Sequence, residues 1–303
     1  MVSWQTTTAS LLSRLTVKQL LQRDVSIAKL RGQMGAIERL FAEHPPGFEV
    51  ARNDPLPQCD AEWIRARGAR TERVILHFPG GAYVARLPNM ERAMLARLCT
   101  AATARARLVF YRLAPEHPFP AGHEDGIGAY LQLLELGIAA DRIVLSGISA
   151  GGGLALGVLL ALRDRGVPMP AGAILMSPLT DLTDPHDGSR VANAARDPVL
   201  SHKRGMEMRA MYVGGIAERM IDPYVSPVFG DFTGLPPLFF QVGSTEILLD
   251  DSRRCAERAR AAGVRTECEV WTEVPHGWQG LPFGPESERA IEHCADFVRE
   301  CCP

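Results

Sequence analysis

Short apolar runs recur along the chain from about residue 60, and most have the β-branched or aromatic composition of strands buried on both faces. Stretches that predict helices lie between these runs. The predicted strands are 73–78, 107–111, 142–146, 171–176, 237–241 and 266–271, and the predicted helices include 88–104, 151–165 and 250–262. Alternating strands and helices predict an α/β fold, with a mostly parallel central sheet flanked by helices.

The ends of the predicted helices carry recognisable signals. Gly166 and Gly263 follow two of the helices directly, where glycine commonly provides the C-cap. A final helix is predicted from a stripe at 3.6-residue spacing, made of Ala290, Ile291, Cys294, Phe297, Val298 and Cys301.

Residues 1–45 have a helical pattern instead. Thr16 and Gln19 have the spacing of a capping box. Four apolar residues fall on one predicted helix face at spacings of four, three and four: Leu30, Met34, Ile37 and Phe41. A Pro-Pro-Gly run at 45–47 separates this region from the rest of the chain.

The segment of about 184–221 also interrupts the alternation of strands and helices. Its pattern predicts a helical insertion, which could form a lid together with the N-terminal helices. The predicted organisation is a helical cap segment over 1–45 and one α/β domain over 46–303, with a helical cap insertion near 184–221.

Composition and charge narrow the classes of function. The 303 residues are 46% hydrophobic and 22% charged, so a large core is available. The formal net charge of −2 argues against a nucleic-acid partner, which needs a basic excess, and against a polybasic membrane anchor. The uncharged stretch 146–162, which ends at Arg163, is shorter than a membrane-spanning helix.

The location and metal content follow from similar arguments. The first residues contain neither the basic region nor the long apolar stretch of a signal peptide. The seven cysteines form no regular framework, which indicates reduced thiols and a cytoplasmic protein. The eight histidines include no HxH or HExxH pair, so no metal site is expected.

The strongest chemical signal is the pentapeptide 147–151, Gly-Ile-Ser-Ala-Gly, between a predicted strand and a predicted helix. A GxSxG turn in this context places its serine on a strained elbow with an exposed hydroxyl. Glycines are needed there because neighbouring backbone comes too close for Cβ atoms. Ser149 is therefore the candidate nucleophile; the competing interpretation is a glycine-rich turn with a buried serine.

A serine nucleophile needs a base and an acid that orients the base, in the chain order Ser, Asp or Glu, His. His276 lies in a loop just after the last predicted strand and is the candidate base, with His202 a distant second. Glu246 follows the strand at 237–241 and is the candidate acid. Asp250 is the alternative acid, although Asp250 and Asp251 are also suited to the first turn of the next helix.

Acyl transfer also needs hydrogen-bond donors for an oxyanion. The run 79–83, Pro-Gly-Gly-Ala-Tyr, follows the predicted strand 73–78, and its small residues let backbone N–H groups turn toward a substrate carbonyl. The N–H of Ala150, directly after the nucleophile, would complete the hole. The candidate oxyanion residues are Gly80, Gly81, Ala82 and Ala150. Without Ser149, an ordinary turn would be the preferred interpretation of this run.

These residues resemble the hormone-sensitive-lipase-like branch of the α/β-hydrolases, often called bacterial family IV. The resemblance runs from about Cys59 to His276. Besides the elbow, it rests on the decapeptide 111–120 (YRLAPEHPFP), on 177–181 (SPLTD), on 223–227 (PYVSP) and on 246–248 (EIL). It implies an α/β-hydrolase catalytic domain whose pocket is covered by a helical cap built from the N-terminus and an insertion.

Two residues depart from the family pattern. Pro79 stands where the family's oxyanion loop usually begins with histidine in His-Gly-Gly-Gly, so it can supply neither an N–H nor the side-chain hydrogen bonds of that histidine. By this alignment the loop donors are the N–H groups of Gly81 and Ala82. Ile148 precedes the nucleophile where the family has Asp or Thr. Neighbouring His77 is expected to be structural.

The sequence thus predicts a carboxylesterase, a serine hydrolase with a Ser149, His276 and Glu246 triad that forms an acyl-enzyme with small esters. The resemblance, with its cap over the pocket, implies short acyl chains. No cofactor is expected, and the expected partner is a small-molecule ester. Tyr83 and Trp278 are candidates for the substrate pocket, with core packing as an equal alternative.

Two other functions stay open at this stage. A non-catalytic ligand-binding protein on a hydrolase scaffold is one, since fold does not fix function; the intact set of three catalytic residue types argues against it. A lactonase, amidase or thioesterase with the same triad is the other. The oligomeric state is left open, a homo-oligomer included.

Overall fold

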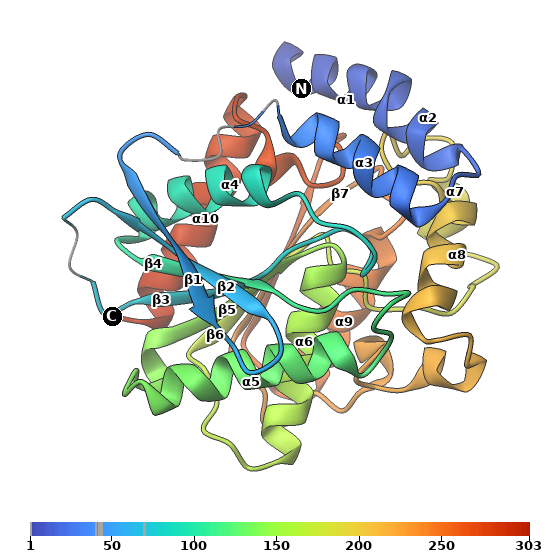
Figure 1. Ribbon diagram of the computed structural model, residues 1–303. Helices are drawn as coiled ribbons and strands as arrows, with labels where there is room; N and C mark the ends of the chain where they lie inside the picture. The colour runs from blue at the N-terminus through green and yellow to red at the C-terminus, as the bar shows by residue number, and fades with distance from the viewer. Residues whose placement is uncertain (1, 40, 42–44, 69–70) are drawn as a thin grey trace.

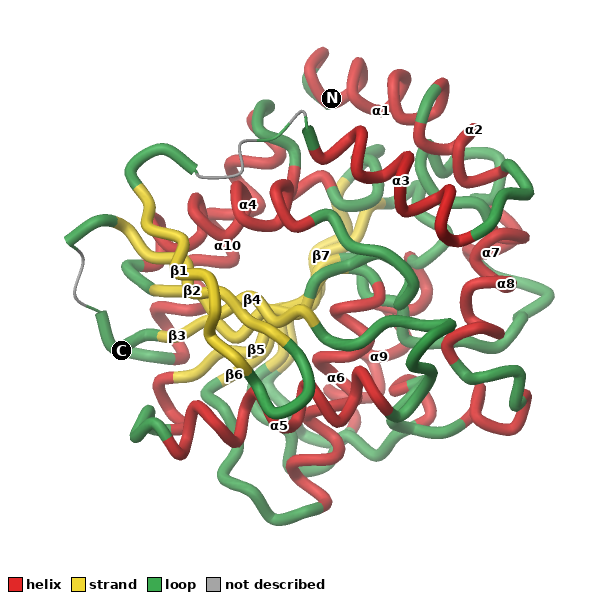
Figure 2. Tube along the Cα trace, in the orientation of Figure 1, coloured by secondary structure: helices red, strands yellow, loops and turns green. Residues whose placement is uncertain are grey.

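An eight-stranded sheet forms the centre of the molecule in this computed structural model, which describes residues 2–39, 41, 45–68 and 71–303 (Figures 1 and 2). The strand order is β1-β2-β4-β3-β5-β6-β7-β8. All six predicted strands are present, as β3 (Val74–Phe78), β4 (Arg105–Phe110), β5 (Ile143–Ile148), β6 (Gly172–Met176), β7 (Leu238–Gly243) and β8 (Thr266–Trp271), and they pair in parallel. The predicted α/β class and mostly parallel sheet are confirmed.

Two strands at one edge of the sheet were not predicted. β1 (Phe48–Pro55) and β2 (Asp60–Ala66) pair antiparallel with each other, and β2 pairs antiparallel with β4. Every residue of β3, β5, β6 and β7 is buried, which explains why these strands appear in the sequence as continuous apolar runs.

Helices cover both faces of the sheet (Figure 1). α4 (Pro88–Ala102) and α10 (Pro285–Cys301) pack on one face, in a core that includes Leu95, Ile174 and Cys294. α5 (Ala121–Glu135), α6 (Ala150–Asp164) and α9 (Leu249–Ala261) contribute to the larger core on the other face. The short 3-10 helices are η1 (Ala140–Arg142), η2 (Ala217–Ile221), η3 (Pro227–Phe229) and η4 (Trp278–Gly280).

The predicted glycine C-caps are confirmed. Gly166 after α6 and Gly263 after α9 have φ angles of 64° and 78°, in the left-handed region that glycine adopts without strain. In each case the next residue donates its N–H back to the helix, from Val167 to Leu162 and from Val264 to Ala259.

The N-terminal region and the insertion lie together beside the sheet, as Figure 1 shows. The N-terminal helices are α1 (Trp4–Leu15), α2 (Val17–Gln22) and α3 (Ile27–Glu38), and the insertion contains α7 (Ser189–Ala192) and α8 (His202–Tyr212). Arg14 and Lys18 donate hydrogen bonds to backbone carbonyls of residues 194–197, and Arg204 donates one to Val25. The division at 45/46 into a cap segment and a catalytic domain stays a prediction.

The predicted capping box at the start of α2 does not form, so that prediction is wrong. Thr16 is the residue that precedes α2, but its hydroxyl donates to the carbonyl of Leu12 at 2.7 Å and caps no N–H of α2. A threonine hydroxyl four residues after a helical carbonyl has this competing partner, and here it wins. The stripe in α3 is also shorter than predicted, because the helix ends at Glu38 and Phe41 lies beyond it.

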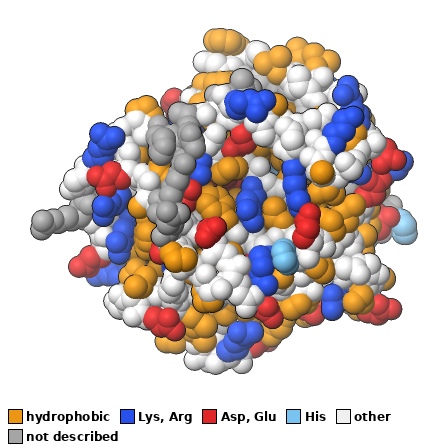
Figure 3. All heavy atoms as spheres, in the orientation of Figure 1, with side chains coloured by type: hydrophobic (Ala, Val, Ile, Leu, Met, Phe, Trp, Pro, Cys, Tyr) orange, Lys and Arg blue, Asp and Glu red, His pale blue; other side chains and the backbone are white. Residues whose placement is uncertain are grey.

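The outer face of α1 is apolar and exposed. Its large exposed side chains are Trp4, Leu11, Leu12 and Leu15, and hydrophobic atoms gather at the top of the view in Figure 3, over this helix. Among the described residues no helix has both the length and the apolar composition needed to span a membrane.

Candidate active site

Ser149 stands between the last residue of β5 and the first residue of α6. Its φ and ψ of 56° and −120° put a non-glycine residue in strained backbone, as the elbow requires. A Cβ on Gly147 would lie 2.1 Å from the carbonyl oxygen of Gly151, and a Cβ on Gly151 would lie 1.9 Å from that of Phe78. The expectation that only glycine fits on either side of the elbow is confirmed.

A buried hydrogen bond joins His276 to Glu246. The His276 Nδ1 lies 2.6 Å from the Glu246 Oε2, and the Glu246 side chain is fully buried. The other carboxylate oxygen of Glu246 accepts from the Ser177 hydroxyl at 2.7 Å and from the Gly243 N–H at 2.6 Å. Both oxygens are therefore fixed, and the ring is held so that its Nε2 is the atom left for another partner.

The electrostatics around His276 favour its protonated form. Burial alone lowers the pKa of His276, but the charge and hydrogen bond of Glu246 and the charge of Asp197 outweigh it, so the net pKa is raised above its ordinary value. In these surroundings the His276 ring readily accepts a proton, and the neighbouring carboxylates stabilise the resulting positive charge.

The oxyanion loop and the histidine loop both lie against the elbow. A Cβ on Gly80 would be 3.5 Å from the Ser149 Cβ and 3.1 Å from the Ile148 carbonyl oxygen. A Cβ on Gly277, directly after His276, would be 3.4 Å from the Ile148 side chain. The structure thus brings together three segments that are far apart in the sequence.

The loop after β3 has an unusual backbone. Gly81, Ala82 and Tyr83 have φ angles of 119°, 54° and 62°, and a Cβ on Gly81 would lie 2.1 Å from the Ala85 carbonyl oxygen. Within the part of the chain that the structure describes, no acceptor is bonded to the N–H groups of Gly81, Ala82 or Ala150. Of the four candidate oxyanion residues, these are the three whose N–H groups have no acceptor in the described structure.

Gly80 was grouped with the oxyanion residues, and the structure corrects that role. Its N–H donates to the Glu91 Oε1 at 3.0 Å, and Gly80 is buried. An N–H group directed at a buried carboxylate does not face a substrate. Gly80 therefore shapes the loop and does not donate a hydrogen bond to the substrate oxygen.

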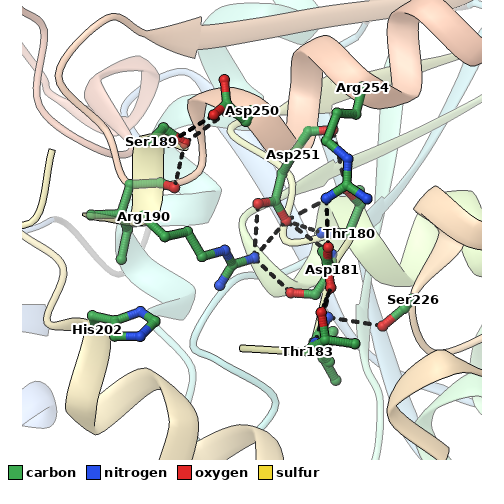
Figure 4. Close-up of polar contacts among 12 residues, drawn as sticks. Thr180, Asp181, Thr183, Ser189, Arg190, His202, Ser226, Asp250, Asp251 and Arg254 are labelled. Carbon is green, nitrogen blue, oxygen red and sulfur yellow. Dashed lines mark hydrogen bonds and ion pairs between the residues drawn. The ribbon is translucent and has the colours of Figure 1, made fainter. Parts of the chain in front are cut away.

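The alternative acid, Asp250, is directed toward Ser189 of the insertion (Figure 4). Its Oδ2 accepts from the Ser189 N–H at 2.6 Å, and its own N–H donates to the Ser189 hydroxyl at 3.0 Å. Neighbouring Asp251 accepts from the Thr180 N–H and forms a buried ion pair with Arg190. Both aspartates lie in the first turn of α9, as expected, and they connect this helix to the insertion.

The alternative base, His202, is bonded to a different carboxylate, that of Asp184. It is the first residue of α8, and its Nε2 lies 2.8 Å from the Asp184 Oδ1, with the histidine side chain 30% exposed. Figure 4 shows its ring apart from the Asp181 and Asp251 carboxylates. The only glutamate that His276 contacts in the described structure is Glu246.

The two aromatic candidates for the pocket differ in their surroundings. Trp278 is fully buried with Val274 and Ala290, and its ring lies 5.9 Å from that of Trp271, so the structure favours the core interpretation for Trp278. Tyr83 is 2% exposed and stacks on Tyr212 of α8, with ring centroids 3.7 Å apart. Tyr83 therefore connects the loop after β3 with the insertion.

Sequence reasoning missed three residues that hold the acid. Ser177 bonds the Glu246 carboxylate, Asn193 donates to the Glu246 carbonyl at 2.9 Å, and Asp197 accepts from the Ile247 N–H at 2.9 Å. Ser177 directly follows β6, at the same edge of the sheet, and this position was a usable signal. Asn193 and Asp197 lie in the insertion, and nothing in the sequence relates them to Glu246.

The described residues contain no cluster of three or more His, Cys, Asp or Glu side chains that could hold a metal ion.

Comparisons with known proteins agree with this arrangement. A sequence model of the family described as the alpha/beta hydrolase fold matches residues 75–280. An acetyl-hydrolase of Streptomyces hygroscopicus is 41% identical over 257 residues, which cover 84% of this chain and 83% of that protein. An esterase of Acinetobacter venetianus is 35% identical, with 96% and 94% covered.

A solved structure is similar over its whole length. The crystal structure of an esterase from the bacterial hormone-sensitive lipase family has a TM-score of 0.92 and 36% identity, and each chain covers 100% of the other. Fold and site together therefore define an α/β-hydrolase. The chain belongs to the α/β-hydrolase family, in its hormone-sensitive-lipase-like branch of esterases.

Proposed function

We propose that this esterase hydrolyses small carboxylic esters with short acyl chains through a covalent acyl-serine intermediate. Ser149 is the nucleophile, His276 the general base and acid, and Glu246 the acid that orients the base. The observation that carries the proposal is the buried 2.6 Å contact between the His276 Nδ1 and the Glu246 Oε2, on a loop that lies against the strained serine elbow.

In the first half of the reaction, the Ser149 Oγ attacks the ester carbonyl while the His276 Nε2 takes the hydroxyl proton. The negative charge that develops on the carbonyl oxygen is stabilised by the N–H groups of Gly81, Ala82 and Ala150. His276 then gives its proton to the leaving alcohol as the ester C–O bond breaks, and the acyl group stays on the serine.

In the second half, a water molecule gives a proton to the His276 Nε2 and attacks the acyl carbon. Collapse of the second tetrahedral intermediate breaks the bond to Ser149, which recovers its proton from His276, and the acid leaves. Glu246 stays ionised throughout. It fixes the tautomer of His276 and stabilises the imidazolium that forms in both halves.

Two observations support a small acyl group. The buried Tyr83 ring, directly after Ala82 of the oxyanion loop, stacks on the buried Tyr212 ring of the insertion, which limits the room beside this loop. A related protein that is 41% identical is named an acetyl-hydrolase. We infer that acetyl and butyryl esters are better substrates than long-chain esters.

A panel of p-nitrophenyl esters from acetate to laurate tests this function. We expect kcat/KM to be greatest for the short esters, and Ser149→Ala to lower turnover by about 10⁴-fold or more. Ser13→Ala, on α1 and outside the site, is the matched control and is expected to keep full activity. Equal activity in Ser149→Ala and the wild type would exclude the serine mechanism, and a preference for laurate would exclude the short-acyl assignment.

We also propose a cytoplasmic location, which the state of the cysteines supports. All seven are free, and burial raises the pKa of Cys99 and Cys255 to about 12, so these thiols resist oxidation. Cell fractionation of the producing organism tests this location, and recovery of the protein outside the cytoplasm would refute it.

A further inference from the structure

A buried polar network lies directly beneath the oxyanion loop. The His77 Nε2 is 2.7 Å from the Glu91 Oε2, and the His77 Nδ1 is 3.0 Å from the Ser146 Oγ. The second carboxylate oxygen of Glu91 accepts from the Gly80 N–H at 3.0 Å. His77 and Ser146 are fully buried and Glu91 is 1% exposed. The network joins β3, β5 and α4 to the first glycine of the loop.

The loop needs such support because its conformation is strained. Ala82 and Tyr83 carry side chains at φ angles of 54° and 62°, a region that is strained for non-glycine residues. Such residues persist only where the surroundings fix them. Two contacts hold the start of the loop: the Tyr111 hydroxyl donates to the Pro79 carbonyl at 2.9 Å, and the Gly80 N–H donates to Glu91.

Pro79 cannot anchor the loop through a side chain or an N–H of its own, because proline has neither an N–H nor a polar side chain. His77, two residues earlier on the same strand, points into the buried layer beneath α4 and brings an imidazole to Glu91 there. We propose that the His77–Glu91 pair is the positioning device for the oxyanion hole, fixing Gly80 so that the Gly81 and Ala82 N–H groups face the substrate.

The protons of the network can be assigned consistently. With Glu91 ionised, a neutral His77 donates from Nε2 to Glu91 and accepts the Ser146 hydroxyl proton at Nδ1. Glu91 then receives one bond at each oxygen, from His77 and from Gly80. Glu91 also lies in the first turn of α4, where the helix dipole favours a negative charge. Every polar group named here has a partner.

The inference rests on the proposed acyl-enzyme function, because an oxyanion hole acts only if a tetrahedral intermediate forms. Two variants of similar length separate the hydrogen bonds of Glu91 from the space that its side chain fills. Glu91→Gln keeps an oxygen that accepts from Gly80 and an amide that donates to the His77 ring. Glu91→Met has a similar length but offers neither group. Both are compared with the wild type for kcat, KM and inhibition by a trifluoromethyl ketone, which binds as a tetrahedral adduct on the nucleophile.

We expect Glu91→Met to lower kcat by about 10²-fold with KM changed by less than about threefold, because a displaced loop loses transition-state contacts. The inhibition constant of the ketone should rise by about the same factor as kcat/KM falls, since both depend on the oxyanion hole. Glu91→Gln should keep kcat within about fivefold of the wild type. A purely structural role for Glu91 would not couple the ketone affinity to kcat/KM.

Rates are expressed per active site titrated with a fluorophosphonate, so a misfolded fraction does not enter kcat. Two His77 variants test the pair independently. His77→Gln places an amide near the position of Nε2 and keeps the contact with Glu91, whereas His77→Asn reaches only toward Ser146. We expect His77→Gln to be the more active of the two, by about tenfold or more.

The outcomes distinguish this inference from the proposed function. If Ser149→Ala loses activity but Glu91→Met keeps its kcat and its ketone affinity, the positioning role is refuted and the acyl-enzyme mechanism stands. If Ser149→Ala keeps activity, the proposed function fails. Equal losses in Glu91→Gln and Glu91→Met, together with equal losses in both His77 variants, would likewise overturn the role of the pair.

Discussion

Strained residues mark the reactive part of this molecule at the residue scale. Ser149 and Ser177 are at φ angles of 56° and 45°, and Ala82 and Tyr83 lie in the same left-handed region. Ser149 is the proposed nucleophile, Ser177 donates to the Glu246 carboxylate, and the other two belong to the proposed oxyanion loop. Strain at these positions is maintained by the hydrogen bonds and close packing around them.

The choice between the two candidate acids can be tested by amide substitutions that preserve shape. We expect Glu246→Gln to lower kcat by about 10³- to 10⁴-fold, because the uncharged amide no longer stabilises the imidazolium and favours the wrong tautomer. Asp250→Asn is expected to cost less than about tenfold, since Asp250 bonds Ser189 in the insertion. Steady-state kinetics on p-nitrophenyl butyrate measure both, and a larger loss in Asp250→Asn would transfer the acid role to Asp250.

The raised pKa of His276 predicts a pH dependence. The base must be neutral to accept the serine proton, so kcat/KM falls as the pH drops through the pKa of His276. Since that pKa is raised, the acidic limb should lie above the ordinary histidine value of about 6.5. Asp197 is one cause of the raised pKa, and Asp197→Asn should therefore move the limb to lower pH.

The measurement is kcat/KM from about pH 5 to about pH 9 for the wild type and Asp197→Asn. Asp222→Asn, which changes an aspartate whose Oδ1 bonds the Tyr224 N–H, is the control and is expected to leave the limb in place. An acidic limb that stays fixed or moves upward in Asp197→Asn would contradict this assignment.

Site residues could be predicted from the sequence where the reaction constrains both their chemical type and their order along the chain. Ser149 was identified from the glycines that its elbow needs, and His276 from its loop after the last strand. Glu91, Asn193 and Asp197 could not be found in this way. Their partners lie on other elements, and a lone acid or amide in a helix or insertion carries no sign of the group that it will meet.

At the scale of elements, complete burial made the central strands easy to recognise. The four central strands are buried throughout and were recognised from their apolar runs. β1 and β2 lie at the edge, and charged residues and Pro55 interrupt their pattern.

Helix α5 was missed for a different reason. It contains Gly122, Gly126 and Gly128, and glycine is a poor helix former. Two of these glycines serve tertiary packing: a Cβ on Gly126 would lie 2.8 Å from the Val158 side chain of α6, and one on Gly122 would lie 3.0 Å from the Arg112 carbonyl oxygen. Close packing of α5 against α6 and Arg112 thus outweighs the low helix propensity of glycine.

The connection between the insertion and α9 makes a prediction about stability (Figure 4). Arg190 and Asp251 form an ion pair with both side chains 3% exposed, and Arg190 also donates to the Asp181 carbonyl. Arg190→Met would leave the Asp251 carboxylate buried without its counter-charge and should lower the free energy of unfolding by about 3 kcal/mol.

The exposed pair of Arg65 and Glu49, with side chains 52% and 45% exposed, provides the control. Arg65→Met should change the free energy of unfolding by less than about 1 kcal/mol. Urea denaturation of both variants measures the difference, and equal effects would show that the buried pair has no special role in holding the insertion.

At the scale of the whole molecule, the sheet brings the site together. The oxyanion loop follows β3, Ser149 follows β5, Ser177 follows β6, Glu246 follows β7 and His276 follows β8. Because these strands are parallel, their carboxyl ends meet at one edge of the sheet, where α/β folds bind their ligands. At that edge the insertion supplies Asn193 and Asp197, which bond the backbone of the loop that carries Glu246.

The central claim is that this edge of the sheet activates one serine. Labelling the folded protein with a fluorophosphonate probe, followed by mass spectrometry of its peptides, tests the claim most directly. The expected result is one phosphonylated residue, Ser149, with loss of esterase activity in proportion to labelling and with no labelling in Ser149→Ala. An active esterase that takes up no label, or carries it on a different residue, would contradict the claim.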